Sequence, residues 1–314
     1  MIKPSGRQSV WLRWGLALLT LALVLWLVEP ADVGERLKAV QWPWLLLALA
    51  ITPVQVLLSA WRWQFTVGRL GGRLPLGYAV REYYVTTLVN QLVPGGVVGD
   101  AGRSLRYRQR MPSTALAIHG VMIERLSGQL LLVLVGLLLV VVWLPLPMPT
   151  RPALVLVPGA LVAILLIWSL AQSPVVARWW SGFSQHVRTA LFSHAAWPVQ
   201  FISSLLVISS YLAVFWCLAM GLGLPVAVDD VGLLLALCTI LLMSMTIPLT
   251  VAGWGVREGT AAMLWPLAGM DAESGMALAV CYGLLVLVSA LPGALFLVNG
   301  ERRAPDQTAY HCPD

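Results

Sequence analysis

The chain reads Asn90-Gln-Leu-Val-Pro-Gly-Gly-Val-Val-Gly-Asp-Ala-Gly-Arg103 at one polar interruption and Ile247-Pro-Leu-Thr-Val-Ala-Gly-Trp-Gly-Val-Arg-Glu258 at another. Arg257 and Glu258 of the second stretch sit in the middle of a strongly apolar run. Ionised side chains at membrane depth cost several kcal/mol unless they pair or line a wet cavity. Broken backbone is tolerated there only where it faces protein or such a cavity. The two stretches are therefore the best candidates for a functional site.

The composition is that of a membrane protein. Of the 314 residues, 59% are hydrophobic and 11% are charged, whereas a soluble domain carries about 25% charge. Several uncharged runs exceed the roughly 20 residues needed to cross hydrocarbon: 126–150, 152–177, 189–228, 231–256 and 274–300. They are continuously apolar rather than alternating, which argues against a β-barrel. The sequence thus predicts an all-α polytopic membrane protein with one domain, 1–314, ending in a short cytoplasmic tail, 301–314.

Other classes of function find little support. The net charge of +6 is expected to orient the chain and to meet anionic headgroups rather than nucleic acid. The cysteines and histidines lack metal-ligand spacing, and no cofactor is expected. No nucleophile stands beside a base. The glycines after Pro94 lack the lysine and serine or threonine of a P-loop, so movement of a substrate would be passive or ion-coupled.

The distribution of arginine predicts the topology, with both termini in the cytoplasm. A segment with Arg62, Arg69, Arg73 and Arg81 is expected to be cytoplasmic, as is the later cluster that begins at Arg103. Segment 82–99 must then leave and re-enter on one side, because its helix to Pro94 is about 20 Å long and the hydrocarbon core is about 30 Å thick. Loop 172–197 is also expected inside. Six full spans are predicted: 11–28, 43–60, 115–143, 152–171, 198–220 and 276–298.

A second hairpin is predicted over 231–269, turning near Val251–Arg257 and entering from the opposite face. Opposed broken hairpins that meet near the midplane are a known transporter layout. The alternative is eight ordinary spans, which would export one of the arginine clusters.

The residues at the breaks suit an anion. Glycines allow close approach and a positive φ, and free N–H groups at helix starts favour negative charge. We expect Arg103 and Arg257 to clamp a phosphate, with Asp100 and Glu258 orienting them. The glycines concerned are Gly95, Gly96, Gly253 and Gly255.

Each of these roles has an alternative. Arg257 and Glu258 could simply neutralise each other at a helix start, and Arg103 could be a plain cytoplasmic anchor. Glu124 and Arg125 are adjacent and point about 100° apart on a helix, so each is expected to meet a partner on another element, as structural glue or as a substrate contact. Asn90 is expected to bond carbonyls freed by the break. Trp254 would pack against an acyl chain or plug the cavity.

These motifs resemble the lysylphosphatidylglycerol synthase transmembrane-region family, also called flippase-like membrane proteins. The resemblance is carried by Asn90…Pro94-Gly-Gly-x-x-Gly-Asp100-x-x-Arg103, then Glu124-Arg125, then Pro248…Gly253-x-Gly255-Val-Arg-Glu258. It implies a lipid translocase of a bacterial inner membrane whose partner is a phospholipid or lipid-linked substrate. The synthases add a soluble aminoacyl-transferase domain, for which this chain has no room, so a stand-alone module without synthase activity is expected.

Two rival functions stay open at this point. One is a membrane-embedded transferase on lipid-linked substrates, with Asp100 or Glu258 as base. The other is an accessory subunit of a lipid or glycan synthesis complex. A homo-oligomer is also left open.

Overall fold

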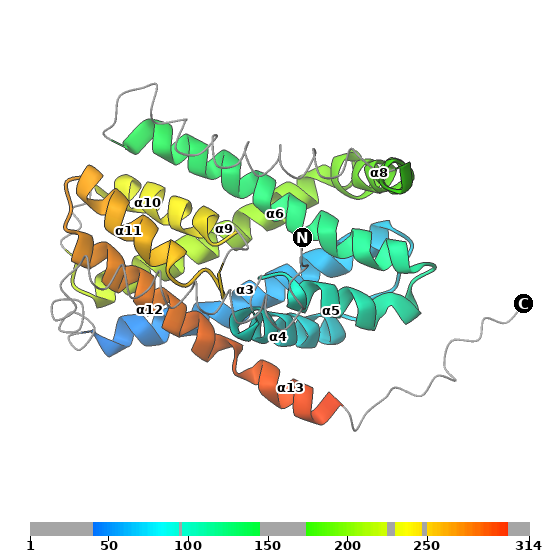
Figure 1. Cartoon of the computed structure of the whole chain (residues 1–314), viewed down its shortest axis with the longest axis horizontal. Helices are drawn as coiled ribbons and strands as arrows, with labels where there is room; N and C mark the ends of the chain where they lie inside the picture. The colour runs from blue at the N-terminus through cyan, green and yellow to red at the C-terminus, as the bar shows by residue number, and fades with distance from the viewer. Residues whose placement is uncertain (1–39, 94–95, 145–173, 225–229, 247–249, 301–314) are drawn as a thin grey trace, which may run out of the picture.

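The computed structural model (Figure 1) describes residues 40–93, 96–144, 174–224, 230–246 and 250–300. These residues form helices joined by turns, with no strand among them. The predicted all-α fold is therefore confirmed. Two predicted spans, 11–28 and 152–171, and the tail 301–314 lie outside the described residues.

Four helical segments are long and apolar enough to cross a membrane. They are α3 (Trp42–Arg69), α6 (Thr114–Trp143), α9 (Trp197–Gly221), and α12 (Ala272–Ala290) continued by α13 (Pro292–Gly300). The bounds of α6 and α9 agree with the predicted spans 115–143 and 198–220.

Two predictions near the helix ends are wrong. The α3 helix does not end at residue 60 but runs to Arg69. The segment predicted as loop 172–197 contains the helix α8 (Pro174–Val187) and a π-helical turn, η2 (Arg188–Phe192). A 3-10 turn, η1 (Arg108–Arg110), precedes α6.

The polarity of α3 is inverted relative to a soluble helix. Large apolar side chains such as Leu46 and Val54 are exposed, whereas a polar stripe is buried: Thr52, Gln55, Ser59, Arg62 and Thr66. The stripe follows steps of three and four residues, which lie on one face of a helix. In a membrane the apolar face meets lipid and the polar face needs protein partners. Arg62 therefore lies inside the bundle. The prediction that it belongs to a cytoplasmic segment is wrong.

Two pairs of short helices complete the bundle. In the first pair, α4 (Leu76–Leu92) packs against α5 (Val98–Tyr107), and in the second, α10 (Val231–Ser244) packs against α11 (Val256–Leu267). The α4 and α5 helices have 17 and 10 residues, and the α10 and α11 helices have 14 and 12 residues. At 1.5 Å per residue each helix is shorter than the roughly 30 Å of a hydrocarbon core. These lengths favour two broken hairpins over eight full spans.

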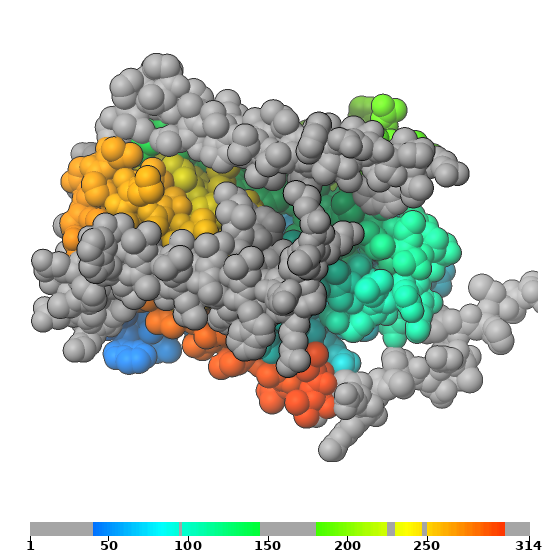
Figure 2. Space-filling model, in the orientation of Figure 1, coloured from blue at the N-terminus to red at the C-terminus, as the bar shows by residue number. Residues whose placement is uncertain are grey.

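The hairpins lie toward opposite ends of the bundle. Figure 1 shows α4 and α5 toward the end where α3 finishes, and α10 and α11 toward the end where α3 begins. The amide of Gln41, just before α3, donates to the carbonyl of Gly221 at the end of α9 (2.8 Å). The start of α3 and the end of α9 therefore lie at the same end of the bundle. The surfaces of the two hairpins are likewise separated in the space-filling view (Figure 2).

Apolar packing holds each half together. One cluster joins α6, α9, α10, α11 and α12, where the rings of Phe215 and Tyr282 stack at 4.2 Å. The other surrounds Trp63, whose ring lies edge-on to those of Tyr83 and Tyr107. The α3 helix packs against both clusters, through Ala48 in the first and through Ala60 and Trp63 in the second.

Candidate functional site

The first break brings α5 into very close contact with α4. Gly96 has a φ of +61°, as expected of a glycine in the turn, whereas Gly95 lies outside the described residues. A Cβ on Gly99 would lie 2.4 Å from the carbonyl oxygen of Thr86. Only glycine therefore lets α5 begin at this distance from α4.

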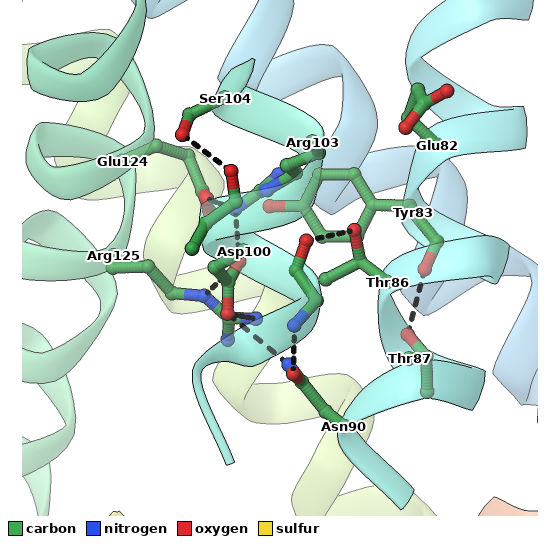
Figure 3. A network of polar contacts seen from close by, with 12 residues as sticks. Glu82, Tyr83, Thr86, Thr87, Asn90, Asp100, Arg103, Ser104, Glu124 and Arg125 are labelled. Carbon is green, nitrogen blue, oxygen red and sulfur yellow. Dashed lines mark hydrogen bonds and ion pairs between the residues drawn. The ribbon is translucent and has the colours of Figure 1, made fainter. Parts of the chain in front are cut away.

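Asn90 holds the start of α5. Its side-chain oxygen accepts a hydrogen bond from the amide of Gly99 (2.7 Å), and its side-chain nitrogen donates to Asp100 Oδ2 (3.2 Å). The sequence predicted carbonyl partners for Asn90, but the partners are an N–H group and a carboxylate, because the break exposes the amino end of α5 at this point. Figure 3 shows Asn90 and Asp100 facing each other across the hairpin.

A buried network of ion pairs joins α5 to α6 and α3. Arg103 Nη2 lies 2.8 Å from both Asp100 Oδ1 and Glu124 Oε2. Arg125 donates to both oxygens of Asp100, from Nε (3.0 Å) and Nη2 (2.8 Å). Glu124 also accepts from Arg62, which reaches it from α3. As predicted, the adjacent residues Glu124 and Arg125 each find partners on other elements (Figure 3).

The network carries an excess of positive charge. Its members in the described chain are three guanidinium groups and two carboxylates, so one positive charge is not compensated within it. Arg103 is further enclosed by aromatic rings, with its guanidinium carbon 4.4 Å from the Tyr83 ring centre and 4.7 Å from that of Trp63. An anion near this site would neutralise the network.

Access to the network differs sharply among the arginines. The Arg103 side chain is fully buried and that of Arg62 is 6% exposed, whereas that of Arg125 is 46% exposed. Arg125 borders a small cavity of about 80 Å³ within the bundle. The cavity is lined mainly by polar side chains from α3, α4, α9 and α12: Thr52, Gln55, Ser59, Tyr83, Thr87, Tyr211 and Ser289.

Gln55 adds an amide donor to this cavity. Its side-chain nitrogen is buried and has no hydrogen-bond partner among the residues that the structure describes. A buried donor without a partner costs about 1–3 kcal/mol. A guanidinium and an unsatisfied amide on one cavity form a site suited to an oxyanion.

The second break forms a separate, sealed cluster. Gly253 and Gly255 have φ values of +79° and +83°, and the amide of Gly255 donates to Glu258 Oε2 (2.7 Å) at the start of α11. Arg257 donates from Nε to Glu258 Oε1 (3.1 Å). Both side chains are at most 1% exposed. Arg257 and Glu258 thus pair with each other, which is the alternative that the sequence left open.

Aromatic rings close this second cluster. The guanidinium carbon of Arg257 lies 4.9 Å from the Trp254 ring centre and 5.6 Å from that of Tyr282. A Cβ on Gly283 would lie 2.2 Å from Arg257 Nη2, so this glycine makes room for the guanidinium. Within the described residues, no hydrogen bond or ion pair joins the second cluster to the first.

Sequence reasoning missed two contributors to the first cluster. Arg62 was assigned to a cytoplasmic segment, and Gln55 was not considered. The polar stripe on α3 was the available signal for both.

The chain belongs to the lysylphosphatidylglycerol synthase TM region family, whose family model matches residues 11–293. The resemblance inferred from the polar motifs is thereby confirmed. A comparison with curated proteins found no match.

Proposed function

From this membership and the geometry above, we propose that the protein is a lipid translocase. It moves an anionic phospholipid or lipid-linked headgroup between the leaflets of a bacterial inner membrane, with both termini in the cytoplasm. The observation that carries the proposal is the half-exposed guanidinium of Arg125, which borders a polar cavity inside the apolar bundle.

The mechanism is an exchange of anions at Arg125. A guanidinium binds a phosphate in the same two-pronged manner as a carboxylate, so a lipid phosphate competes with Asp100 for Arg125. Asp100 keeps Arg103 and Asn90 as partners when Arg125 turns away. The uncompensated positive charge of the network favours this exchange, because one phosphate restores neutrality.

The other arginines support this site indirectly. Arg103 is fully buried and fixes Asp100 and Glu124, so we assign it a positioning role. Gln55 donates to the second phosphate oxygen, while the acyl chains stay in the surrounding lipid. Arg257 was expected to share the phosphate, but its pairing with Glu258 favours the contact at Arg125.

A transport assay in reconstituted vesicles tests the proposal. Fluorescent phosphatidylglycerol or phosphatidylcholine is placed in both leaflets, and its exposure at the outer face is followed with a membrane-impermeant quencher. Arg125→Gln removes a charged hydrogen bond worth about 1.5–3 kcal/mol, so phosphatidylglycerol transfer is expected to slow by about tenfold or more.

Arg106→Gln is the matched control. Arg106 pairs with Glu82 and its side chain is 41% exposed, close to the value for Arg125, but it does not line the cavity. Equal transfer rates in the two variants would remove Arg125 from the mechanism. Chemical conversion of the lipid, detected by mass spectrometry, would instead favour the membrane-embedded transferase.

A further inference from the structure

An apolar groove lies on the outside of the bundle and shares no lining residue with the cavity at Arg125. It runs between α6 and α9 beside η2 and has a volume of about 290 Å³. Its walls carry exposed side chains such as Leu134, Phe192 and Phe201, which are 56%, 63% and 44% exposed. This is roughly twice the ~150 Å³ of an apolar cavity that accommodates benzene.

Two polar side chains on the floor of the groove are hydrogen-bonded to protein, whereas the buried Gln200 Oε1 has no partner among the described residues. Ser127 Oγ donates to the carbonyl of Glu124 (2.8 Å), and Ser204 Oγ accepts from Arg62 Nη1 (3.0 Å). Both helices that form the walls are long and apolar enough to cross a membrane. The groove thus opens onto hydrocarbon, where an acyl chain that fills it gains dispersion contacts.

One end of the groove is basic. Leu191, Phe192 and Trp197 line this end, and the exposed Arg188 lies one helical turn before Leu191. Arg69, at the end of α3, donates to Ser193 Oγ (3.0 Å), which brings a second exposed guanidinium beside the same connection. No salt bridge engages either arginine within the described part of the chain.

We propose that this groove binds one anionic phospholipid as a resident ligand, separate from the lipid that is transported. One acyl chain lies between α6 and α9, and Arg69 and Arg188 bind the phosphate. Trp197, which is 51% exposed, lies at the level where tryptophan favours the membrane–water interface. Charge complementarity selects an anionic lipid over a zwitterionic one.

Photo-crosslinking of lipids in nanodiscs tests the site. Phosphatidylglycerol and phosphatidylcholine, each with a diazirine on one acyl chain, are compared by mass spectrometry of the labelled peptides. Segments 127–134 and 197–204 are expected to label several-fold more with phosphatidylglycerol than with phosphatidylcholine. The exposed face of α3 at Leu46 and Leu47 serves as the reference for ordinary surrounding lipid and should label equally with both.

Variants separate the headgroup site from the chain site. The double change Arg69→Gln and Arg188→Gln should abolish the preference for phosphatidylglycerol, whereas Arg108→Gln, at another exposed arginine, should leave it intact. Leu134→Trp narrows the groove and should lower its labelling by both lipids.

Two outcomes would overturn the proposal. One is equal labelling by both lipids in the groove, as on α3, and the other is a preference that survives the double change. Arg125→Gln should leave groove labelling unchanged. A failure of the transport proposal is thereby distinguished from a failure of this one.

Discussion

Removal of the Glu124 charge is the most direct test of the buried network. Glu124 is 1% exposed and pairs with Arg62 and Arg103, whose side chains are 6% and 0% exposed. In Glu124→Gln these two guanidinium groups lose their shared carboxylate, and neither can turn into water. Breaking a buried ion pair by removing one partner costs about 3–5 kcal/mol, and Asp100 is then the one carboxylate that still pairs with Arg103 in the described chain.

Glu82→Gln provides the comparison. Glu82 is also buried, at 5%, but its partner Arg106 is 41% exposed and can regain water when the pair is lost. An ion pair with such access contributes about 0–1 kcal/mol. Both substitutions replace a carboxylate with an amide. The difference in stability between the two variants therefore measures the effect of burying the arginine partner.

The assay is thermal unfolding of the detergent-solubilised protein, followed by the loss of the monodisperse peak in size-exclusion chromatography. Glu124→Gln should lower the melting temperature by several degrees more than Glu82→Gln. Adding Arg62→Gln to Glu124→Gln should recover part of the loss, because one unpaired guanidinium is removed. Equal shifts for the two single variants would refute the claim that the arginines around Glu124 are confined.

Two further predictions concern the hairpins. Gly99→Ala should destabilise the protein by about 1–3 kcal/mol, because its Cβ meets the immobile carbonyl of Thr86; Gly102→Ala, whose Cβ meets only the end of the flexible Arg106 side chain, should be neutral in the same thermal assay. In a cysteine-free background, Gly136→Cys with Thr239→Cys should form a disulfide, since a Cβ at 136 would lie 3.6 Å from that of Thr239, within the range of disulfide-bonded cysteines. Oxidation should then slow lipid transfer and a reductant should restore it, whereas equal rates in both states would contradict movement of α10.

The sequence predicted those features of the fold that depend on residues close together in the chain. The predicted spans 115–143 and 198–220 agree closely with α6 and α9, because a helix that crosses hydrocarbon needs a long and mostly apolar sequence. The angle between adjacent helical residues predicted that Glu124 and Arg125 have partners on other elements. The identities of those partners could not be predicted, because they depend on how α3, α5 and α6 pack, which no local pattern specifies.

The misassignment of Arg62 has a more specific cause. An arginine between two tryptophans looks like the membrane–water interface when charge is counted residue by residue. The spacing of Gln55, Ser59, Arg62 and Thr66 contained the opposite information, because a polar stripe that continues through the arginine predicts a helix with a buried polar face. Periodicity was thus a better guide than charge at this helix end.

The two hairpins differ in what their movement would cost. Two ion pairs join the α4–α5 hairpin to α6, Arg103 with Glu124 and Asp100 with Arg125. Displacement of this hairpin would break them, at a cost in free energy of several kcal/mol. The α10–α11 hairpin contains both members of its ion pair, Arg257 and Glu258, and moves without separating them. Its links to α12, a cation–π contact at Tyr282 and apolar packing, are weaker than ion pairs in a dry interior. If a hairpin moves during the proposed lipid transport, the charges favour movement of α10–α11. The disulfide between positions 136 and 239 would detect that movement.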